Sequence, residues 1–536
     1  MNRFISFFKS NWLYLLISAI IIGIRSYTHD FFTPLINGNA NVDDTYFVDL
    51  ARHIVKGEWF GPYNYLTLIK VPGDVFWHAL CHQFGISEFW ARLYLYIIAC
   101  ILLTLSLKQF ITNAWLQIFF FTLLIFNPAT FDLDFFQISR DGIHLSTNLL
   151  LFTALFQSYF SRKKRIAPWL ILLCFSFVWT YLIREEGKLL YPILAIFQVI
   201  YILRNRRKLK VHLVKTTFLI LLPWTSLIGT INFISYKNYT QYGFYGVCER
   251  QSDEFNAFLG ALNRVSFDKA LPLISSFQED REILYSKTKH FATLQPFLDG
   301  RQKWKRTIKL SSGEELFEYG GWLEWAIRWA VKDAGHYKNP TETEDFYKAM
   351  TFEINQLCDK GIIKTSLDET SSPVPPFKKE YLNDFIYEFY KGCWKVMTFK
   401  DAEPPLEIKH RGNKQQIDIF ADFIHSRKRS VSFNDDDMII ICLSYSLTIY
   451  KYVMPFFFLM STLLLFSKSL NIEIKYFVFI IFIYIGMRIA ALAYIQTTQY
   501  FAIRVDYMYP LYPLYIMCTL LPLLIIFEKR LKPVSQ

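Results

Sequence analysis

Charged residues are scarce in this sequence. They make up 19% of its 536 residues, against about a quarter in a typical soluble protein. Hydrophobic residues account for 53% and aromatic residues for 18%, a composition that a water-soluble chain of this length would struggle to keep in solution. The sequence has no internal repeat, no low-complexity tract and no collagen-like glycine period. These features exclude disordered, collagen-like and small disulfide-rich proteins and indicate an integral membrane protein.

Cysteine is also sparse, with eight residues and no CxxC or His/Cys cluster at zinc spacing. A metal site built from thiolates is therefore not expected. Cys248, Cys358 and Cys393 fall in a segment that we expect outside the membrane, and whether two of them form a disulfide is left open by the sequence.

Long apolar runs recur at both ends of the chain, each near the roughly 20 residues that cross a bilayer as a helix. They predict an all-α polytopic membrane protein with about ten transmembrane helices. The first run has no small-residue cleavage site behind it, so we expect a retained helix rather than a signal peptide. The expected spans are 12–24, 89–107, 112–126, 143–160, 166–183, 189–203, 211–235, 448–466, 476–495 and 508–527.

Basic residues gather in the loops on one side of these spans. They include Lys108, 162–165, 204–210, Lys468, Lys475 and 529–532, together with Arg3 and Lys9. Only Glu473 and Glu528 are acidic in the same loops. The positive-inside rule predicts that both termini are cytoplasmic, and we expect the inner membrane of a bacterium. The net charge of +12 follows from this asymmetry, so no nucleic-acid partner is expected.

The spans divide the chain into three parts. Residues 1–235 form an N-terminal transmembrane module whose first outer loop covers 25–88, and residues 438–536 form a C-terminal transmembrane module. Between the seventh and eighth spans, residues 236–437 predict a mainly helical extracytoplasmic (periplasmic) domain.

The first outer loop carries an adjacent acidic pair, Asp43 and Asp44, at the start of an expected amphipathic helix. Two neighbouring carboxylates suit a general base for an incoming hydroxyl or a divalent cation site, but they also suit a simple helix cap. Lys70, before Val71-Pro72-Gly73, either binds a phosphate or extends its stem along the membrane interface.

Further charged residues fall at the outer ends of later spans. Arg140/Asp141 and Arg184/Glu185 are either ion-paired loop ends or parts of a site. Arg488 lies inside the ninth span, where a charge must face protein or water rather than lipid. With Arg504 before the last span, these cations would suit the phosphate of a lipid whose tail lies in the membrane.

The order of these residues resembles that of GT-C superfamily glycosyltransferases, membrane enzymes that include the protein mannosyltransferase and aminoarabinose transferase families. The similar segments are 43–51, 57–59, 70–73, Arg140/Asp141, Arg184/Glu185 and Arg504 with Tyr509-Pro510. The resemblance covers residues 1–235 well and 448–536 loosely. This sequence differs from that family in the position of its large soluble domain, which many relatives carry after the last span.

The resemblance implies that a sugar moves from a polyprenyl-phosphate-linked donor to a glycan, lipid or protein acceptor of the cell envelope. It implies Asp43 or Asp44 as the catalytic base. It implies that Lys70, Arg184 and Arg504 bind the donor phosphate, and a supporting role falls to Arg140, Asp141, Glu185 and Arg488. No cofactor follows with certainty, and a divalent cation at Asp43/Asp44 stays open.

Two other classes of protein remain open. A polysaccharide polymerase or O-antigen-ligase-like protein would rely on arginine and histidine in the late outer segment, where Arg328 and His336 lie. A non-enzymatic scaffold or a transporter would have broken spans with paired polar residues at mid-membrane, and apart from Arg488 the expected spans have few such groups. Neither the sugar nor the acceptor follows from the sequence.

Overall fold

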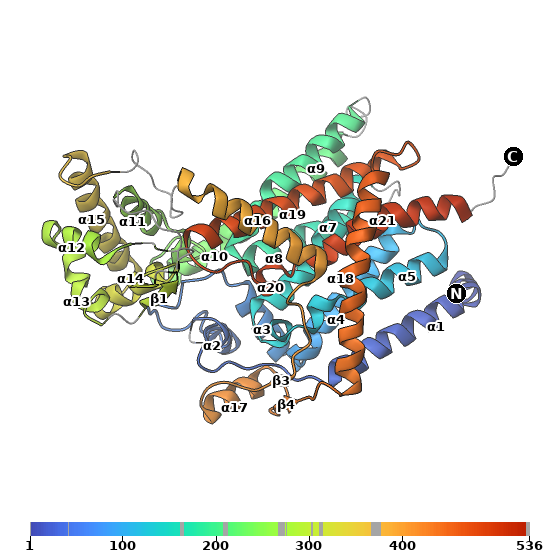
Figure 1. Ribbon diagram of the computed structural model, residues 1–536, viewed down its shortest axis with the longest axis horizontal. Coiled ribbons are helices and arrows are strands. Elements are labelled where there is room, and N and C mark those ends of the chain that lie inside the picture. The colour runs from blue at the N-terminus through green and yellow to red at the C-terminus, as the bar shows by residue number, and fades with distance from the viewer. Residues whose placement is uncertain are drawn as a thin grey trace.

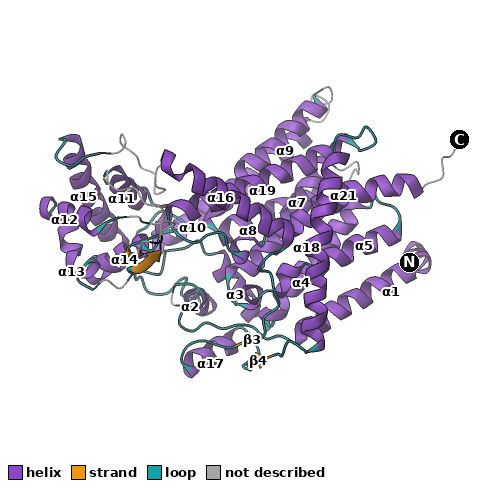
Figure 2. Ribbon diagram, viewed as in Figure 1, coloured by secondary structure: helices purple, strands orange, loops and turns teal. Residues whose placement is uncertain are grey.

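The computed structural model describes residues 2–40, 42–160, 166–206, 213–265, 274, 276–301, 304–309, 313, 315–365 and 377–531. Helices dominate the described chain (Figure 2). The strands of these residues form two small antiparallel pairs, β1 (Arg306–Lys309) with β2 (Glu315–Glu318) and β3 (Glu407–Ile408) with β4 (Val431–Ser432). The basic residues at 162–165 and 207–210 and Lys532 lie outside the described residues.

Each of the ten expected spans coincides with a helix. These helices are α1 (Asn2–Asp30), α4 (Glu88–Leu107), α5 (Ala114–Ile125), α7 (Arg140–Phe160), α8 (Ala167–Ile183), α9 (Leu190–Asn205), α10 (Leu213–Tyr242), α18 (Met438–Leu464), α19 (Ile472–Thr498) and α21 (Leu511–Leu531). Among the described residues, seven helices are long and apolar enough to cross a membrane, namely α1, α4, α9 with the turn before it, α10, α18, α19 and α21. The protein is therefore an integral membrane protein, and the exact number of spans stays a prediction.

Helix α7 is less apolar than the others because it lies at the centre of the bundle. From Asp141 to Phe160 it is buried, between α4 and α8. Its polar side chains bind other protein groups, as where Tyr484 donates to Asn148 at 2.8 Å. A helix surrounded by other helices does not need a fully apolar surface, because it does not face lipid.

Contacts at one end of the bundle join the loops that the charge pattern places together. Thr112 donates to Glu528 at 2.5 Å, and Arg204 pairs with Glu473 at 2.7 Å. Lys529 donates to the carbonyl of Ser469 at 2.5 Å. These loops therefore share one end of the bundle, as alternating spans require, and the assignment of this end to the cytoplasm stays a prediction.

A helical lobe lies beside the bundle (Figure 1). It consists of α11 (Asp253–Arg264), α12 (Gln278–Lys287), α13 (Gln295–Leu298), α14 (Leu323–Asp333) and α15 (Pro340–Asp359). The lobe has its own apolar core, which includes Phe258, Ile327, Met350 and Ile354. Helix α15 begins after Asn339, whose side chain accepts a hydrogen bond from the Glu342 backbone at 2.9 Å.

The rest of the segment 236–437 packs elsewhere. Helix α16 (Leu382–Thr398) lies against α19 of the bundle, and Phe399 after it stacks on Tyr512 with ring centroids 5.1 Å apart. Helix α17 (Lys414–Phe423) packs on α2 (Asp44–Val55) of the first outer loop. The division of the chain at residues 235 and 437 stays a prediction. All eight cysteines, including Cys248, Cys358 and Cys393, are free thiols.

The first outer loop contains two helices: α2, which is the expected amphipathic helix, and α3 (Gly73–Gln83). With the short helix α20 (Val505–Met508), they lie between the helical lobe and the long apolar helices (Figure 1). This region holds the charged residues described next.

Candidate functional site

Asp43 and Lys70 meet in the first outer loop. The Lys70 ammonium forms an ion pair with the Asp43 carboxylate and donates to the carbonyl of Val42 at 2.5 Å. The lysine side chain is buried, whereas 52% of the Asp43 side chain is exposed. The lysine therefore does not extend its stem along the membrane interface: it holds a carboxylate that solvent and ligands can reach.

The charges around Asp43 keep its carboxylate ionised. Close packing by neighbouring protein acts to raise its pKa, even though half the side chain is exposed, but the charges of Lys70 and Arg140 outweigh that effect and the pKa lies below its usual value. Asp43 also makes no capping hydrogen bond to the backbone of α2. Asp43 stands at the N-cap position of α2, but its carboxylate is directed at Lys70.

Asp44 lies in different surroundings from its neighbour. Its side chain is fully buried and accepts hydrogen bonds from the Gln137 amide at 2.9 and 3.1 Å. Burial raises the pKa of Asp44 to about 8, although the Gln137 hydrogen bond acts to lower it. Asp44 is thus protonated at neutral pH and closed off from an incoming substrate.

The two carboxylates do not form a cation site by themselves. Asp43 faces an ammonium and Asp44 faces an amide. In the part of the chain that the structure describes, no three His, Cys, Asp or Glu side chains converge in a way that could hold a metal ion. A divalent cation at Asp43 would have to displace Lys70, so the residues present do not fit it.

Two ion pairs connect the start of α7 with the end of α8. They join Arg140 to Glu185 and Arg184 to Asp141, rather than joining the neighbours within each loop. Arg140 at the start of α7 binds Glu185 at 3.2 Å, in the 3-10 turn η2 (Glu185–Leu189). Arg184, at the end of α8, pairs with Asp141. These pairs tie α7 to α8 on the side where Asp43 lies, since the charges of Arg140 and Arg184 both lower the pKa of Asp43.

The same network extends to Arg488 in α19. Arg488 is buried, as expected for a cation inside a span, and it binds Glu186 at 3.0 Å. It also donates to the carbonyl of Tyr507 at 3.0 and 3.2 Å. Arg184 binds the other oxygen of Glu186 at 3.2 Å. Glu186, to which the sequence analysis assigns no role, therefore joins two of the predicted site residues.

Arg504 forms the accessible edge of this cluster. Its guanidinium binds Asp506 at 2.9 Å, and 54% of its side chain is exposed. Both Arg184 and Arg504 lie over the Tyr507 ring, at 4.5 and 5.6 Å from its centroid. Burial and the nearby Asp141 raise the pKa of Asp506 to about 7, although Arg504 acts to lower it. Asp506 is the second acidic residue that sequence analysis did not assign, although it stands two residues after Arg504.

A second buried network was missed altogether. His78 of α3 lies between Glu88 at 2.5 Å and Asp74 at 3.2 Å, and all three side chains are inaccessible to solvent. Arg92 closes the network by binding Glu88 at 2.6 Å and the carbonyl of Gln137 at 2.8 Å. The sequence signal that could have indicated this network is Asp74 and His78, four residues apart in an otherwise apolar helix. This network braces α3 against α4 and, through Gln137, supports Asp44.

The structure sets Asp44 apart from the other predicted site residues. The others take part in neighbouring ion pairs: Asp43, Lys70, Arg140, Asp141, Arg184, Glu185, Arg488 and Arg504. Buried ion pairs seldom add net stability, because removing charges from water is costly. Clusters of this kind are instead frequent at functional sites. The arrangement offers one accessible carboxylate and several cations at one end of the apolar helices.

No protein-family model and no curated protein matches the sequence. Two solved structures of ArnT from Cupriavidus metallidurans are similar to this chain. The apo structure is 12% identical, with a TM-score of 0.29, and the match covers 96% of this chain and 78% of that one. The structure bound to undecaprenyl phosphate is 11% identical, with a TM-score of 0.33, and covers 95% and 78%. Because both TM-scores are low, this likeness carries no argument about the function of the chain.

Proposed function

We propose that this protein is a membrane glycosyltransferase that moves a sugar from a polyprenyl-phosphate-linked donor to an acceptor of the cell envelope at the outer face. The observation that carries the proposal is the half-exposed Asp43 carboxylate held by the buried Lys70. The arginine cluster beside it supplies the charge that a phosphate needs. The order of these residues along the chain resembles the GT-C pattern, which supports the same reaction.

In the proposed reaction Asp43 is the general base. The acceptor hydroxyl gives its proton to the Asp43 carboxylate while its oxygen forms a bond to the anomeric carbon of the donor sugar. The bond from that carbon to the phosphate oxygen breaks, and its electron pair leaves with the polyprenyl phosphate. A general base positioned in this way typically contributes about 10²- to 10⁴-fold to the rate.

The cations have two different roles in this proposal. Arg504 is half-exposed and Lys70 adjoins the accessible carboxylate, so these two can reach the leaving phosphate. Arg184 is buried and already binds Asp141 and Glu186. Its charge therefore acts on the phosphate mainly through the field of the cluster and by holding the outer ends of α7 and α8 together. Fixed charges in a site with little water stabilise developing negative charge strongly.

The polymerase or ligase alternative gains no support from Arg328 and His336. The Arg328 guanidinium is buried, binds Glu249 at 2.5 Å and donates to the carbonyl of Tyr65 at 2.8 Å. His336 stacks on Phe346 with ring centroids 3.8 Å apart. Both side chains thus already have structural partners, and we propose no second function.

A transfer assay with purified protein in lipid nanodiscs tests the proposal. The probes are synthetic polyprenyl phosphates that carry a labelled hexose or aminopentose, with a cell-envelope extract as the source of acceptor. We expect label to leave the polyprenyl lipid only when both protein and extract are present. Failure to use any donor, together with failure to bind polyprenyl phosphate itself, would contradict the proposal.

A further inference from the structure

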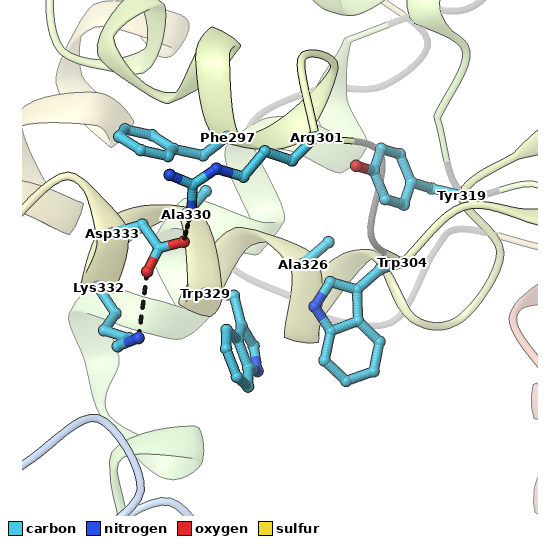
Figure 3. Close-up of a pocket in the computed structure, with 9 residues that line it drawn as sticks. All are labelled: Phe297, Arg301, Trp304, Tyr319, Ala326, Trp329, Ala330, Lys332 and Asp333. Carbon is cyan, nitrogen blue, oxygen red and sulfur yellow. Dashed lines mark hydrogen bonds and ion pairs between the residues drawn. The ribbon is translucent and has the colours of Figure 1, made fainter.

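The helical lobe contains a small pocket of about 210 Å³ on one side of α14 (Figure 3). Trp304 and Trp329 stand side by side at its mouth, with ring centroids 6.0 Å apart and planes at 57° (Figure 3). Trp304 also stacks on Trp322 at 5.7 Å. Together these indoles present aromatic surface at two angles, which suits a ring-shaped ligand with an apolar face.

Charged groups lie beside the aromatic surface. Asp333 is bound by Arg301 at 2.7 Å and by Lys332 at 3.1 Å (Figure 3). The Arg301 side chain lines the pocket and is 62% exposed. The indole nitrogen of Trp304 is buried and has no hydrogen-bond partner among the described residues.

Helix α14 connects this pocket to the charged site. Trp325, in its first turn, lies 5.6 Å from the Lys70 ammonium, measured to the centroid of its ring. Trp329, one turn further on, packs edge-to-face on Tyr65 of the first outer loop at 5.1 Å. Asp333 follows one turn after that. Because a helix rises 1.5 Å per residue, Trp325 and Asp333 are about 12 Å apart along the helix, which is the length of a few sugar units.

We propose that this pocket binds one sugar ring of the acceptor, so that the acceptor is a carbohydrate rather than a protein or a free lipid. The proposal rests on the proposed glycosyltransferase function and names its acceptor class. A pyranose ring has a C–H face that packs on indole rings and hydroxyls that bind a carboxylate and a guanidinium. The next sugar along the chain would then point toward Lys70 and Asp43.

The size and polarity of the pocket favour a sugar over the alternatives. Its volume is below the roughly 300–1,000 Å³ of pockets for drug-sized ligands, so it fits a single ring. An acyl chain would cover the ion pair of Asp333 and Arg301 without offering it any hydrogen bond in place of water. A peptide side chain would reach one wall of the pocket but would not offer the row of hydroxyls that these groups match.

Oligosaccharide binding to the full-length protein in lipid nanodiscs tests the proposal. Nanodiscs are needed because glycoside detergents carry sugar headgroups. The probes are hexasaccharides of glucose, of mannose, of N-acetylglucosamine, and of alternating glucuronic acid and N-acetylglucosamine, followed by tryptophan fluorescence and saturation-transfer NMR. We expect at least one to bind, with Trp329→Ala and Asp333→Asn each weakening it about tenfold or more. Phe352→Ala, an exposed aromatic on α15 of the same lobe, is the matched control and should bind normally.

The outcomes separate this inference from the proposed function. If wild-type protein binds none of the four probes, the sugar pocket is overturned even if transfer occurs. The same holds if Trp329→Ala and Asp333→Asn, tested as single variants, both bind as wild type does. Polyprenyl phosphate binding should be unchanged in both variants, because neither residue belongs to the charged cluster. Normal oligosaccharide binding through the pocket without any transfer would support the pocket and contradict the transferase proposal.

Discussion

Asp43 and Asp44 are neighbours in the chain, yet their side chains lie in opposite surroundings. Successive residues at a helix start point about 100° apart, so the accessible carboxylate of Asp43 reaches the buried Lys70 and that of Asp44 enters the protein beside Gln137. Composition and spacing cannot separate two adjacent aspartates in this way. The pairing of Asp43 with Lys70, which is 27 residues away, also depends on the folded loop and has no local signal.

The buried Asp44 predicts a pH dependence of stability. In the folded protein its carboxyl keeps a proton up to about pH 8, whereas an unfolded carboxyl loses it near pH 4. The folded state therefore binds more protons between these values, and the free energy of unfolding falls as pH rises through them. In Asp44→Asn this contribution is absent, so the melting temperature should fall less from pH 5 to pH 9 than in wild type.

Thermal unfolding in nanodiscs at pH 5, 7 and 9 measures this difference, which we expect to be a few degrees. Asp345→Asn, at an exposed position on α15, is the matched control and should follow the wild-type curve. If Asp44→Asn shows the same pH dependence as wild type, Asp44 is not the buried, protonated group described above.

The two arginines predicted to serve the phosphate should behave differently when removed. Arg504→Ala should weaken binding of polyprenyl phosphate and leave the melting temperature nearly unchanged, because Arg504 is half-exposed. Arg184→Ala should also weaken binding, but it leaves Asp141 and Glu186 without their buried partner. Breaking a buried ion pair in this way costs about 3–5 kcal/mol, so this variant should also unfold at a clearly lower temperature.

Binding of polyprenyl phosphate and thermal unfolding of each purified variant check this prediction. Arg427→Ala is the matched control, since Arg427 is also half-exposed and ion-paired, at 2.7 Å to Asp30. Unchanged lipid affinity in both the Arg184 and the Arg504 variants would mean that these residues only brace their loops.

At the scale of elements, Gly73 explains why α3 can lie so close to α8. A Cβ atom at Gly73 would stand 2.5 Å from the backbone carbonyl of Leu182, two residues before Arg184. No neighbouring side chain can move aside, because the contact is with backbone. The Val71-Pro72-Gly73 turn after Lys70 therefore sets the distance between the first outer loop and the arginine cluster.

Gly73→Ala should push α3 away from α8, lower the melting temperature and reduce sugar transfer. Overpacking of this kind typically costs about 1–3 kcal/mol. Gly229→Ala in α10, where no atom lies within 4 Å of the added Cβ, should be as stable as wild type or slightly more so. Wild-type stability and transfer in the Gly73 variant would show that the close approach is not required.

The helices themselves were largely predictable, because an apolar run long enough to cross a bilayer has few alternatives to a helix. The packing of the segment 236–437 was not. Helix α16 lies against α19 and α17 against α2, and an amphipathic pattern does not say which neighbour covers its apolar face. The His78 network was missed for a similar reason, since Glu88 and Arg92 lie on a different helix from His78.

The orientation of the whole molecule decides which face of the membrane holds the charged cluster, and the proposed transfer requires the outer face. The basic loops predict that the cluster and the helical lobe are outside. With the exposed Cys442 replaced by serine, single cysteines at Lys163 and Arg207 should be protected from a membrane-impermeant thiol reagent in intact cells. A cysteine at Asn339 in the lobe should react. Labelling of Lys163→Cys from outside would reverse the orientation and remove the basis of the site assignment.

The central claim is that Asp43 is the base of a sugar transfer, and one measurement tests it most directly. Transfer from a polyprenyl-phosphate-linked sugar should be compared among wild type, Asp43→Asn, Asp44→Asn and the exposed Asp49→Asn of α2. We expect Asp43→Asn to lose about 10²- to 10⁴-fold in rate while still binding polyprenyl phosphate. We expect Asp44→Asn to lose less than about tenfold in rate and Asp49→Asn to behave as wild type. Near-normal transfer by Asp43→Asn would contradict the account.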